Sequence, residues 1–248
     1  METIHEQGEL RVDQTNTCQL NEISDHYVDR SIAADFKLLV TEYAKRDKAI
    51  FITHDWGSGA ILYILNEYPD VVEKVVLGTA PSRNFKKFFN EQPMNVLRQF
   101  LKSWYIFFFQ LTGLSDHIFT RQNFGFLYLF SGLEDLGRQG RISAEEGLMS
   151  MKNIRDSFTT ASSYYRGAFK PRLRGRVFVD DIDCPILFTH AENDRFLSEP
   201  PLQFALREAL TPKAKERSKV VTFADTPHWI EYFGEVVIPV IEKFIKEE

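Results

Sequence analysis

A single carboxylate stands at an unusual place in the sequence, just after a short apolar stretch. Residues Ala49–Ile52 are apolar throughout, which predicts a strand buried on both faces, and Asp55 follows closely. The next residues, Trp56-Gly57-Ser58-Gly59, lead into an apolar-periodic segment that ends before Pro69 and predicts a helix. A carboxylate at the end of a buried strand is costly to desolvate unless it has partners. Asp55 is therefore the first candidate for chemistry.

The order of strand, tight turn and helix around Asp55 is that of a nucleophile elbow, in which one side chain is lifted out of the sheet. The N–H groups and dipole of the following helix favour a negative charge at that point. An aspartate there is ionised at neutral pH and attacks without a base to activate it. The alternative is an ordinary helix with Asp55 as its N-cap.

The segment His54-Asp55-Trp56-Gly57 resembles the nucleophile motif of epoxide hydrolases and haloalkane dehalogenases of the α/β-hydrolase fold. The similarity runs from about Asp25 to the C-terminus, with separate motifs in the family order. Residues Val75–Leu77 predict a second buried strand, which completes a βαβ unit and indicates a parallel sheet. The resemblance implies an α/β class and an α/β-hydrolase fold, with a mostly parallel sheet and an inserted helical cap.

Three regions are expected along the chain. Residues 1–82 form the N-terminal part of the α/β core with the elbow, and residues 177–248 form its C-terminal part. Between them, residues 83–176 interrupt the α/β alternation with Phe-rich amphipathic segments and are expected to form the helical cap. Ser143 and Glu146 have the spacing of a capping box and predict the start of a helix.

Two further residues follow in the order nucleophile, acid, histidine. Asp194 comes after a predicted strand at residues 185–189, and His228 comes after another at residues 219–223. The resemblance implies that His228 deprotonates a water, while Asp194 fixes its tautomer and stabilises the imidazolium. Taken singly, His228 is more often a loop histidine bound to backbone, and Asp194 a turn residue.

Two tyrosines in the expected cap complete the resemblance. Tyr105 and Tyr165 match the cap tyrosines that epoxide hydrolases use to open the ring, and Tyr164 is the rival of Tyr165 on the helix. Carboxylate attack on an epoxide develops an alkoxide, and two phenols can hydrogen-bond that oxygen and deliver a proton. The alternative role of these tyrosines is aromatic packing.

The sequence also departs from the family. It contains no His-Gly-X-Pro segment, which in the family supplies half of the oxyanion hole; the other half, the backbone N–H of Trp56, is retained. Thr53 replaces a usual glycine of the elbow. The first three family strands are expected to be missing, which suggests a truncated product. The Ala49–Ile52 strand would then present an apolar edge, open to self-association unless Glu9–Val12 fills the place.

Composition limits the other possibilities. The net charge of −5 gives no reason to expect a nucleic-acid partner. The two cysteines favour a reducing, cytoplasmic location, and we expect no signal peptide and no membrane span. We also expect no metal and no other cofactor, since the histidines lack ligand spacing.

Three hypotheses follow from these observations. The first is an epoxide hydrolase that acts on small apolar epoxides with water as the second substrate, impaired by the missing oxyanion donor. The second is a haloalkane-dehalogenase-like hydrolase, and the third is a non-catalytic protein of the same fold.

Overall fold

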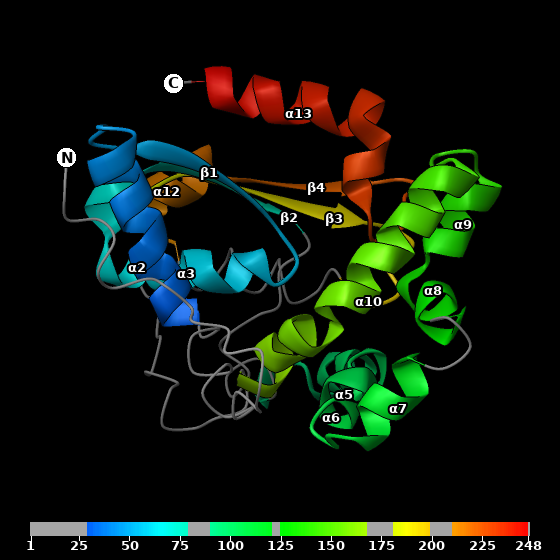
Figure 1. Cartoon of the computed structure of the whole chain (residues 1–248). Helices are drawn as coiled ribbons and strands as arrows, with labels where there is room; N and C mark the ends of the chain where they lie inside the picture. Colours follow the sequence, from blue (N-terminus) through cyan, green and yellow to red (C-terminus); the bar gives the residue numbers. More distant parts are fainter. Residues whose placement is uncertain (1–28, 79–89, 121–124, 168–180, 199–209, 248) are drawn as a thin grey trace.

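The computed structural model describes residues 29–78, 90–120, 125–167, 181–198 and 210–247, and their strands form one parallel sheet (Figure 1). The strands lie side by side in the order β1 (Ala49–His54), β2 (Val72–Gly78), β3 (Ile186–Ala191) and β4 (Lys219–Phe223). Every neighbouring pair is parallel. The predicted α/β class with a parallel sheet is confirmed.

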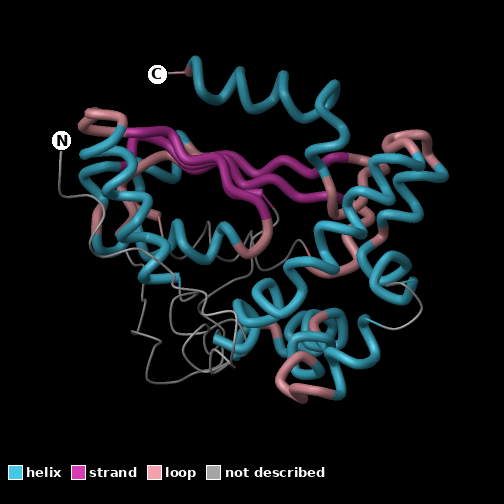
Figure 2. Tube along the Cα trace, in the orientation of Figure 1, coloured by secondary structure: helices cyan, strands magenta, loops and turns pink. Residues whose placement is uncertain are grey.

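Helices cover both faces of the sheet (Figure 2). One face carries α2 (Asp29–Leu38), its π-helical continuation η1 (Leu39–Tyr43) and α3 (Gly57–Glu67), and the other carries α13 (Gly234–Lys246). Ile61 and Ile64 of α3 pack with Val75, while Phe244 of α13 packs with Leu187 on the opposite face. Because neighbouring residues of a strand point to opposite faces, both layers need apolar residues, and the central strands supply them at Val75–Leu77 and Ile186–Phe188.

Strand β1 is less buried than its sequence predicts. Its residues are only partly covered, and Ile52 is 60% exposed, so the prediction of a strand buried on both faces is wrong. The physical reason is its place at the edge, because within the described chain β1 pairs with β2 alone. Among the described residues, the apolar strand β1 therefore lies at the edge of the sheet. Glu9–Val12, the expected filler of this place, lie outside the described residues.

A group of helices separates β2 from β3 in the chain and lies beyond the carboxyl ends of the strands (Figure 1). These helices are α5 (Pro93–Lys102), α6 (Trp104–Phe108), α7 (Leu114–Thr120), α8 (Gly125–Ser131), α9 (Leu133–Arg138) and α10 (Ala144–Gly167). The capping box before α10 is confirmed, because the Ser143 Oγ accepts the Glu146 N–H at 3.1 Å and the Glu146 carboxylate accepts the Ser143 N–H at 2.6 Å. Both predicted cap boundaries fall outside the described ranges and stay predictions.

Short helical turns complete the described part of the chain: η2 (Pro69–Val71), α12 (Pro212–Arg217) and η4 (Ile230–Phe233). In this part of the chain, none of the helices combines the length and the apolar character needed to cross a membrane.

Candidate active site

Asp55 lies in the sharp turn between β1 and α3. Its φ is 49°, in the left-handed region that residues with a side chain seldom adopt, and strain of this kind is concentrated at functional sites. Its backbone N–H donates to the Gly78 carbonyl at 2.9 Å, and its carbonyl accepts the Ser58 N–H at 3.0 Å. The N-cap of α3 is Trp56 and not Asp55, so the conformation is that of an elbow and not of a simple cap.

The elbow depends on the close approach of β1 and β2. A Cβ on Gly78 would lie only 2.7 Å from the Thr53 carbonyl oxygen, so a larger residue there would push the two strands apart. The Thr53 hydroxyl forms a hydrogen bond with the Ser58 hydroxyl at 3.1 Å and donates to the Val76 carbonyl at 3.2 Å. The side chain that Thr53 adds at the elbow is thus accommodated, with its hydroxyl fully hydrogen-bonded.

His228 lies between two carboxylates. Its Nδ1 is 2.8 Å from the Asp194 Oδ2, and its Nε2 is 3.6 Å from the Asp55 Oδ2. The other oxygen of Asp194 accepts the backbone N–H groups of Phe196 at 2.7 Å and Leu197 at 2.9 Å. His228 and Asp194 are each 3% exposed, so their pairing is shielded from water. The structure therefore brings together the three residues that the chain order suggested.

Burial alone would lower the pKa of His228, but hydrogen bonding and charge from Asp194 and Asp55 raise that pKa to about 9. Burial alone would raise the pKa of Asp194, but the imidazole of His228 and the two backbone N–H groups hold it below its ordinary value. In the free protein at neutral pH, the group is therefore an imidazolium between two carboxylates.

The two predicted tyrosines face Asp55 from the cap helices. Tyr105 of α6 and Tyr165 of α10 line the same cavity as Asp55, and their ring centroids are 5.9 Å apart. Burial raises the pKa of both phenols well above 10, and the charge of Asp55 adds to this effect. Both therefore remain protonated and able to donate. The rival, Tyr164, instead donates its hydroxyl to the Trp56 carbonyl at 3.2 Å.

A cavity of about 380 Å³ contains these groups. Aromatic side chains dominate its wall, and the polar exceptions are three serines, His228 and the carboxylates of Asp55 and Glu231. Sequence reasoning missed much of this wall, including Phe109, Phe130, Phe158, Phe196, Trp229 and Tyr232. The many phenylalanines of the chain were the available signal, but spacing alone does not tell which of them face a cavity. An apolar substrate with little charge suits this lining.

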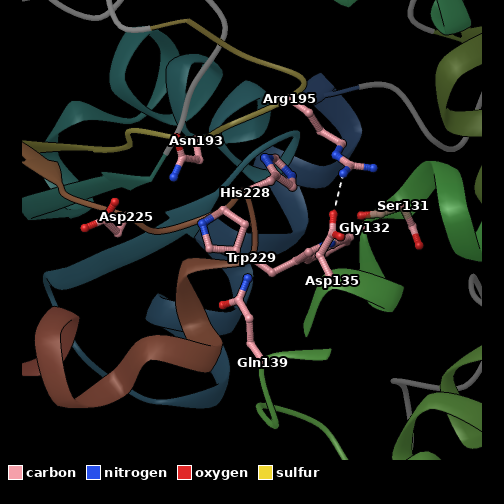
Figure 3. A pocket seen from close by; sticks show the side chains of 10 residues that line it. Ser131, Gly132, Asp135, Gln139, Asn193, Arg195, Asp225, His228 and Trp229 are labelled. Carbon is pink, nitrogen blue, oxygen red and sulfur yellow. Dashed lines mark hydrogen bonds and ion pairs between the residues drawn. The ribbon is translucent and has the colours of Figure 1, made fainter. Parts of the chain in front are cut away.

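A second, polar cavity of about 220 Å³ borders His228 and Trp229 (Figure 3). Its wall includes Asn193, Arg195 and Gln139, and the Arg195 guanidinium is bound by the Asp135 carboxylate at 2.5 Å. The two cavities share Ser131, His228 and Trp229. Polar groups of this kind suit water better than an apolar ligand.

His54 and Trp56, on either side of Asp55, also contact the site. The His54 Nε2–H donates to the His228 carbonyl at 2.9 Å, which ties the elbow to the loop of His228. The Trp56 Nε1 is buried and makes no hydrogen bond within the described part of the chain, although it lies near enough to Tyr105 and Tyr165 to lower their pKa slightly against the larger effect of burial. Neither contact could be predicted from the sequence.

Across the described ranges, no three side chains of His, Cys, Asp or Glu gather as a metal site.

The sequence matches a family described as alpha/beta hydrolase fold over residues 12–235. Among curated proteins, it is 24% identical to Epoxide hydrolase 1 of Caenorhabditis elegans over 231 residues, which cover 90% of this chain and 54% of that protein. It is 26% identical to human Epoxide hydrolase 4 over 208 residues, which cover 81% of this chain and 54% of the relative. The chain thus spans about half the length of the curated relatives it matches.

Solved structures show the same architecture. An epoxide hydrolase of Bacillus megaterium in complex with an inhibitor superimposes with a TM-score of 0.73 at 19% identity, over 90% of this chain and 78% of that one. A mutant of potato epoxide hydrolase gives a TM-score of 0.69 at 17% identity, over 92% and 79% of the two chains. At such identities the likeness establishes the fold alone.

Proposed function

The chain belongs to the alpha/beta hydrolase fold family, and we propose that it is an epoxide hydrolase that opens apolar epoxides to vicinal diols through an ester on Asp55. Two of the curated relatives are named epoxide hydrolases, which supports this activity. Since those relatives are about twice as long as the matched segment, the activity is proposed for this chain and not transferred to it.

One observation carries the proposal. The carboxylate of Asp55, the imidazole of His228 and two protonated phenols border one apolar cavity, and Asp194 binds the far side of that imidazole. A nucleophile, a base and an acid are the parts that a two-step opening of an epoxide needs. The phenols distinguish this arrangement from that of an ordinary ester hydrolase, in which the catalytic histidine protonates the leaving oxygen.

The first step is alkylation. A carboxylate oxygen of Asp55 attacks an epoxide carbon, the carbon–oxygen bond of the ring breaks, and the oxygen takes a proton from Tyr105 or Tyr165. The product is a hydroxyalkyl ester of Asp55. Both phenols are needed at this step because a free alkoxide is a strong base in a cavity that offers it little water.

The second step is hydrolysis. Once Asp55 is an ester, its charge no longer favours the imidazolium. The His228 proton then restores the phenol that gave up its proton in the first step, and the neutral imidazole can act as a base. It takes a proton from water while the oxygen of that water bonds to the Asp55 carboxyl carbon. Collapse of the tetrahedral intermediate breaks the bond to the diol oxygen, which takes up the proton from His228. The Asp55 carboxyl group that remains then gives its proton to His228, which restores the starting state. Asp194 stabilises the imidazolium in between.

The oxyanion of that intermediate has one evident donor, the backbone N–H of Trp56 at the start of α3. The sequence offers no His-Gly-X-Pro segment for the second donor. Since loss of one such donor costs about 10²–10³ in rate, we expect hydrolysis to be the slower step.

The cavity wall indicates the class of substrate. An aromatic lining favours an uncharged, flat apolar epoxide, and a mutant of the Bacillus megaterium enzyme has been solved with a naphthyloxy-propanediol product. Naphthyl glycidyl ether, the matching epoxide, is therefore the first substrate to try.

The test is diol formation from this epoxide, followed by chromatography, with the wild-type chain and three variants. Asp55→Asn should abolish turnover. Tyr105→Phe and Tyr165→Phe should each lower the rate of alkylation by about 10² or more, because each removes a proton donor. A folded wild-type monomer that forms neither diol nor ester would refute the proposal and favour a non-catalytic member of the fold.

One observation favours a second candidate, a haloalkane-dehalogenase-like hydrolase. The buried indole N–H of Trp56 has no hydrogen-bond acceptor in the described residues and could stabilise a leaving halide. Halide release from a haloalkane, without diol from the epoxide, would select this candidate.

A further inference from the structure

Helix α5 of the cap holds the loop of Asp194 through two side chains, and we infer that Gln99 and Lys102 are positioning residues for the His228–Asp194 pair. This inference rests on the function proposed above, because the pair acts in the hydrolytic step of that reaction. The acid loop is taken here as residues 194–198.

Gln99 binds the acid loop from both ends of its amide. Its Nε2 donates to the Phe196 carbonyl at 2.8 Å, and its Oε1 accepts the Ser198 N–H at 3.0 Å and the Ser198 hydroxyl at 2.9 Å. Gln99 is 5% exposed, so these bonds are not exchanged with water. A buried amide paired on both sides fixes its partners in one arrangement.

Lys102, one turn further along α5, binds the same loop at two other carbonyls. Its Nζ donates to the Asp194 carbonyl at 2.7 Å and to the Leu197 carbonyl at 3.2 Å. Burial lowers the pKa of Lys102, while the charge of Asp194 opposes this. Together the two side chains bind the backbone of Asp194, Phe196, Leu197 and Ser198.

The same loop residues present their N–H groups to the acid. The Asp194 Oδ1 accepts the N–H groups of Phe196 and Leu197, and its Oδ2 faces the His228 Nδ1. The N–H groups of Phe196 and Leu197 therefore donate to the Asp194 carboxylate, while carbonyls of the same loop accept hydrogen bonds from α5. If the outer bonds are lost, the inner N–H groups shift with their peptides, and the carboxylate loses its fixed direction toward His228.

Alkylation should depend much less on these bonds. The Tyr105 ring lies 5.6 Å from the Phe196 ring of the acid loop, but it is also held by other aromatic contacts, with ring centroids 5.1 Å from Phe130 and 5.9 Å from Tyr165. Asp55 is held by the elbow and has no contact with α5 among the hydrogen bonds described above. Loss of the α5 bonds should therefore slow hydrolysis of the ester much more than its formation.

The experiment uses the full chain and four variants in single-turnover reactions with naphthyl glycidyl ether. Samples are quenched at intervals, and the fraction of protein carrying the ester is measured by intact-mass spectrometry. Lys102→Met keeps the aliphatic stem and is the decisive variant, because Gln99→Leu leaves buried polar groups unpaired and can unfold the chain. Lys102→Arg tests rescue by another donor. Arg98→Met is the matched control, an exposed cation of α5 for which the structure describes no partner.

In Lys102→Met we expect ester decay to slow by about 10-fold and ester formation to change less than about 2-fold, because a misplaced orienting group lowers the rate of its own step. Lys102→Arg should recover most of the decay rate, and Arg98→Met should match wild type in both steps. Unchanged decay in Lys102→Met, or equal slowing of both steps, would overturn the inference.

A second readout does not need turnover. The Nδ1 proton that His228 shares with Asp194 should give a downfield NMR signal in the wild-type chain, assigned by its loss in His228→Gln. We expect this signal to be weakened by exchange in Lys102→Met and kept in Arg98→Met; an unaltered signal in Lys102→Met would contradict the inference. If the wild-type chain forms neither ester nor diol, the proposed function fails, and the NMR comparison still decides the positioning role.

Discussion

The charge state of His228 should depend on whether Asp55 is ionised, and this dependence can be measured without any substrate. Asp55→Asn replaces the carboxylate by a neutral group of the same shape, as ester formation does. The Nε2 of His228 is 3.6 Å from Asp55 in the native structure. Removing that charge should lower the pKa of His228 from about 9 toward its ordinary value of 6.5.

The size of the effect follows from distance and burial. Two unit charges about 4 Å apart attract by about 4 kcal/mol at an effective dielectric constant of about 20. Asp55 is 23% exposed, so water reduces this figure, and Asp194 supplies the larger share of the stabilisation. We therefore expect the pKa of His228 to fall by about one pH unit or more in Asp55→Asn, which corresponds to at least about 1.4 kcal/mol.

The assay is a proton NMR titration of the His228 ring between pH 5 and pH 10, with its signal assigned by comparison with His228→Gln. The same change should appear in stability. Because the pKa of His228 is raised in the folded chain, its contribution to stability is complete below pH 6.5 and is lost as the pH rises through about 9. The loss amounts to about 3 kcal/mol in wild type and should be smaller in Asp55→Asn.

Equal titration of His228 in the wild-type chain and in Asp55→Asn would refute this reasoning. The two side chains would then not interact, and His228 would not change from cation to base when the ester forms.

Three further predictions concern folding and association. Gly78→Ala should destabilise the chain by about 1–3 kcal/mol in urea unfolding, because a Cβ there would meet the Thr53 carbonyl at 2.7 Å; a neutral effect would mean that β1 and β2 can separate freely. Lys74→Met should cost about 1.5–3 kcal/mol by the same assay, because the buried ammonium donates to the last carbonyls of α13, including that of Ile245 at 2.9 Å; an unchanged midpoint would contradict this. Ile52→Lys should reduce any concentration-dependent self-association seen by analytical ultracentrifugation, because it places a charge on the exposed edge of β1; association of equal strength in Ile52→Lys would assign the contact to another surface.

Much of the fold could be predicted because local patterns and tertiary packing agree. The runs Val75–Leu77 of β2 and Ile186–Phe188 of β3 are apolar and buried, and the capping box of Ser143 and Glu146 starts α10 as expected. The same apolar pattern misled at β1, because a short apolar run does not reveal whether both neighbours of a strand are present.

The candidate site also contains residues that could be predicted from the sequence and residues that could not. Asp55, Asp194 and His228 could be named because the elbow motif and the order nucleophile, acid, histidine along the chain resemble those of the epoxide hydrolase family. Of the neighbours Tyr164 and Tyr165, only Tyr165 lines the cavity. The structure was needed to tell which of the two points toward Asp55. The roles of Gln99 and Lys102 could not be predicted from the sequence. Both side chains bind backbone carbonyls of a distant loop, and every residue has such a carbonyl whatever its type.

If Asp55 is the nucleophile, the substrate is carried on it as an ester, and that ester can be trapped. Purified chain is mixed with naphthyl glycidyl ether, quenched in acid and weighed intact, with Asp55→Ala as control and peptide mapping of the modified residue. We expect an added mass equal to one epoxide, located on Asp55, that decays as diol appears and is absent from Asp55→Ala. Diol formed at the same rate by Asp55→Ala, or an adduct on another residue, would contradict the account.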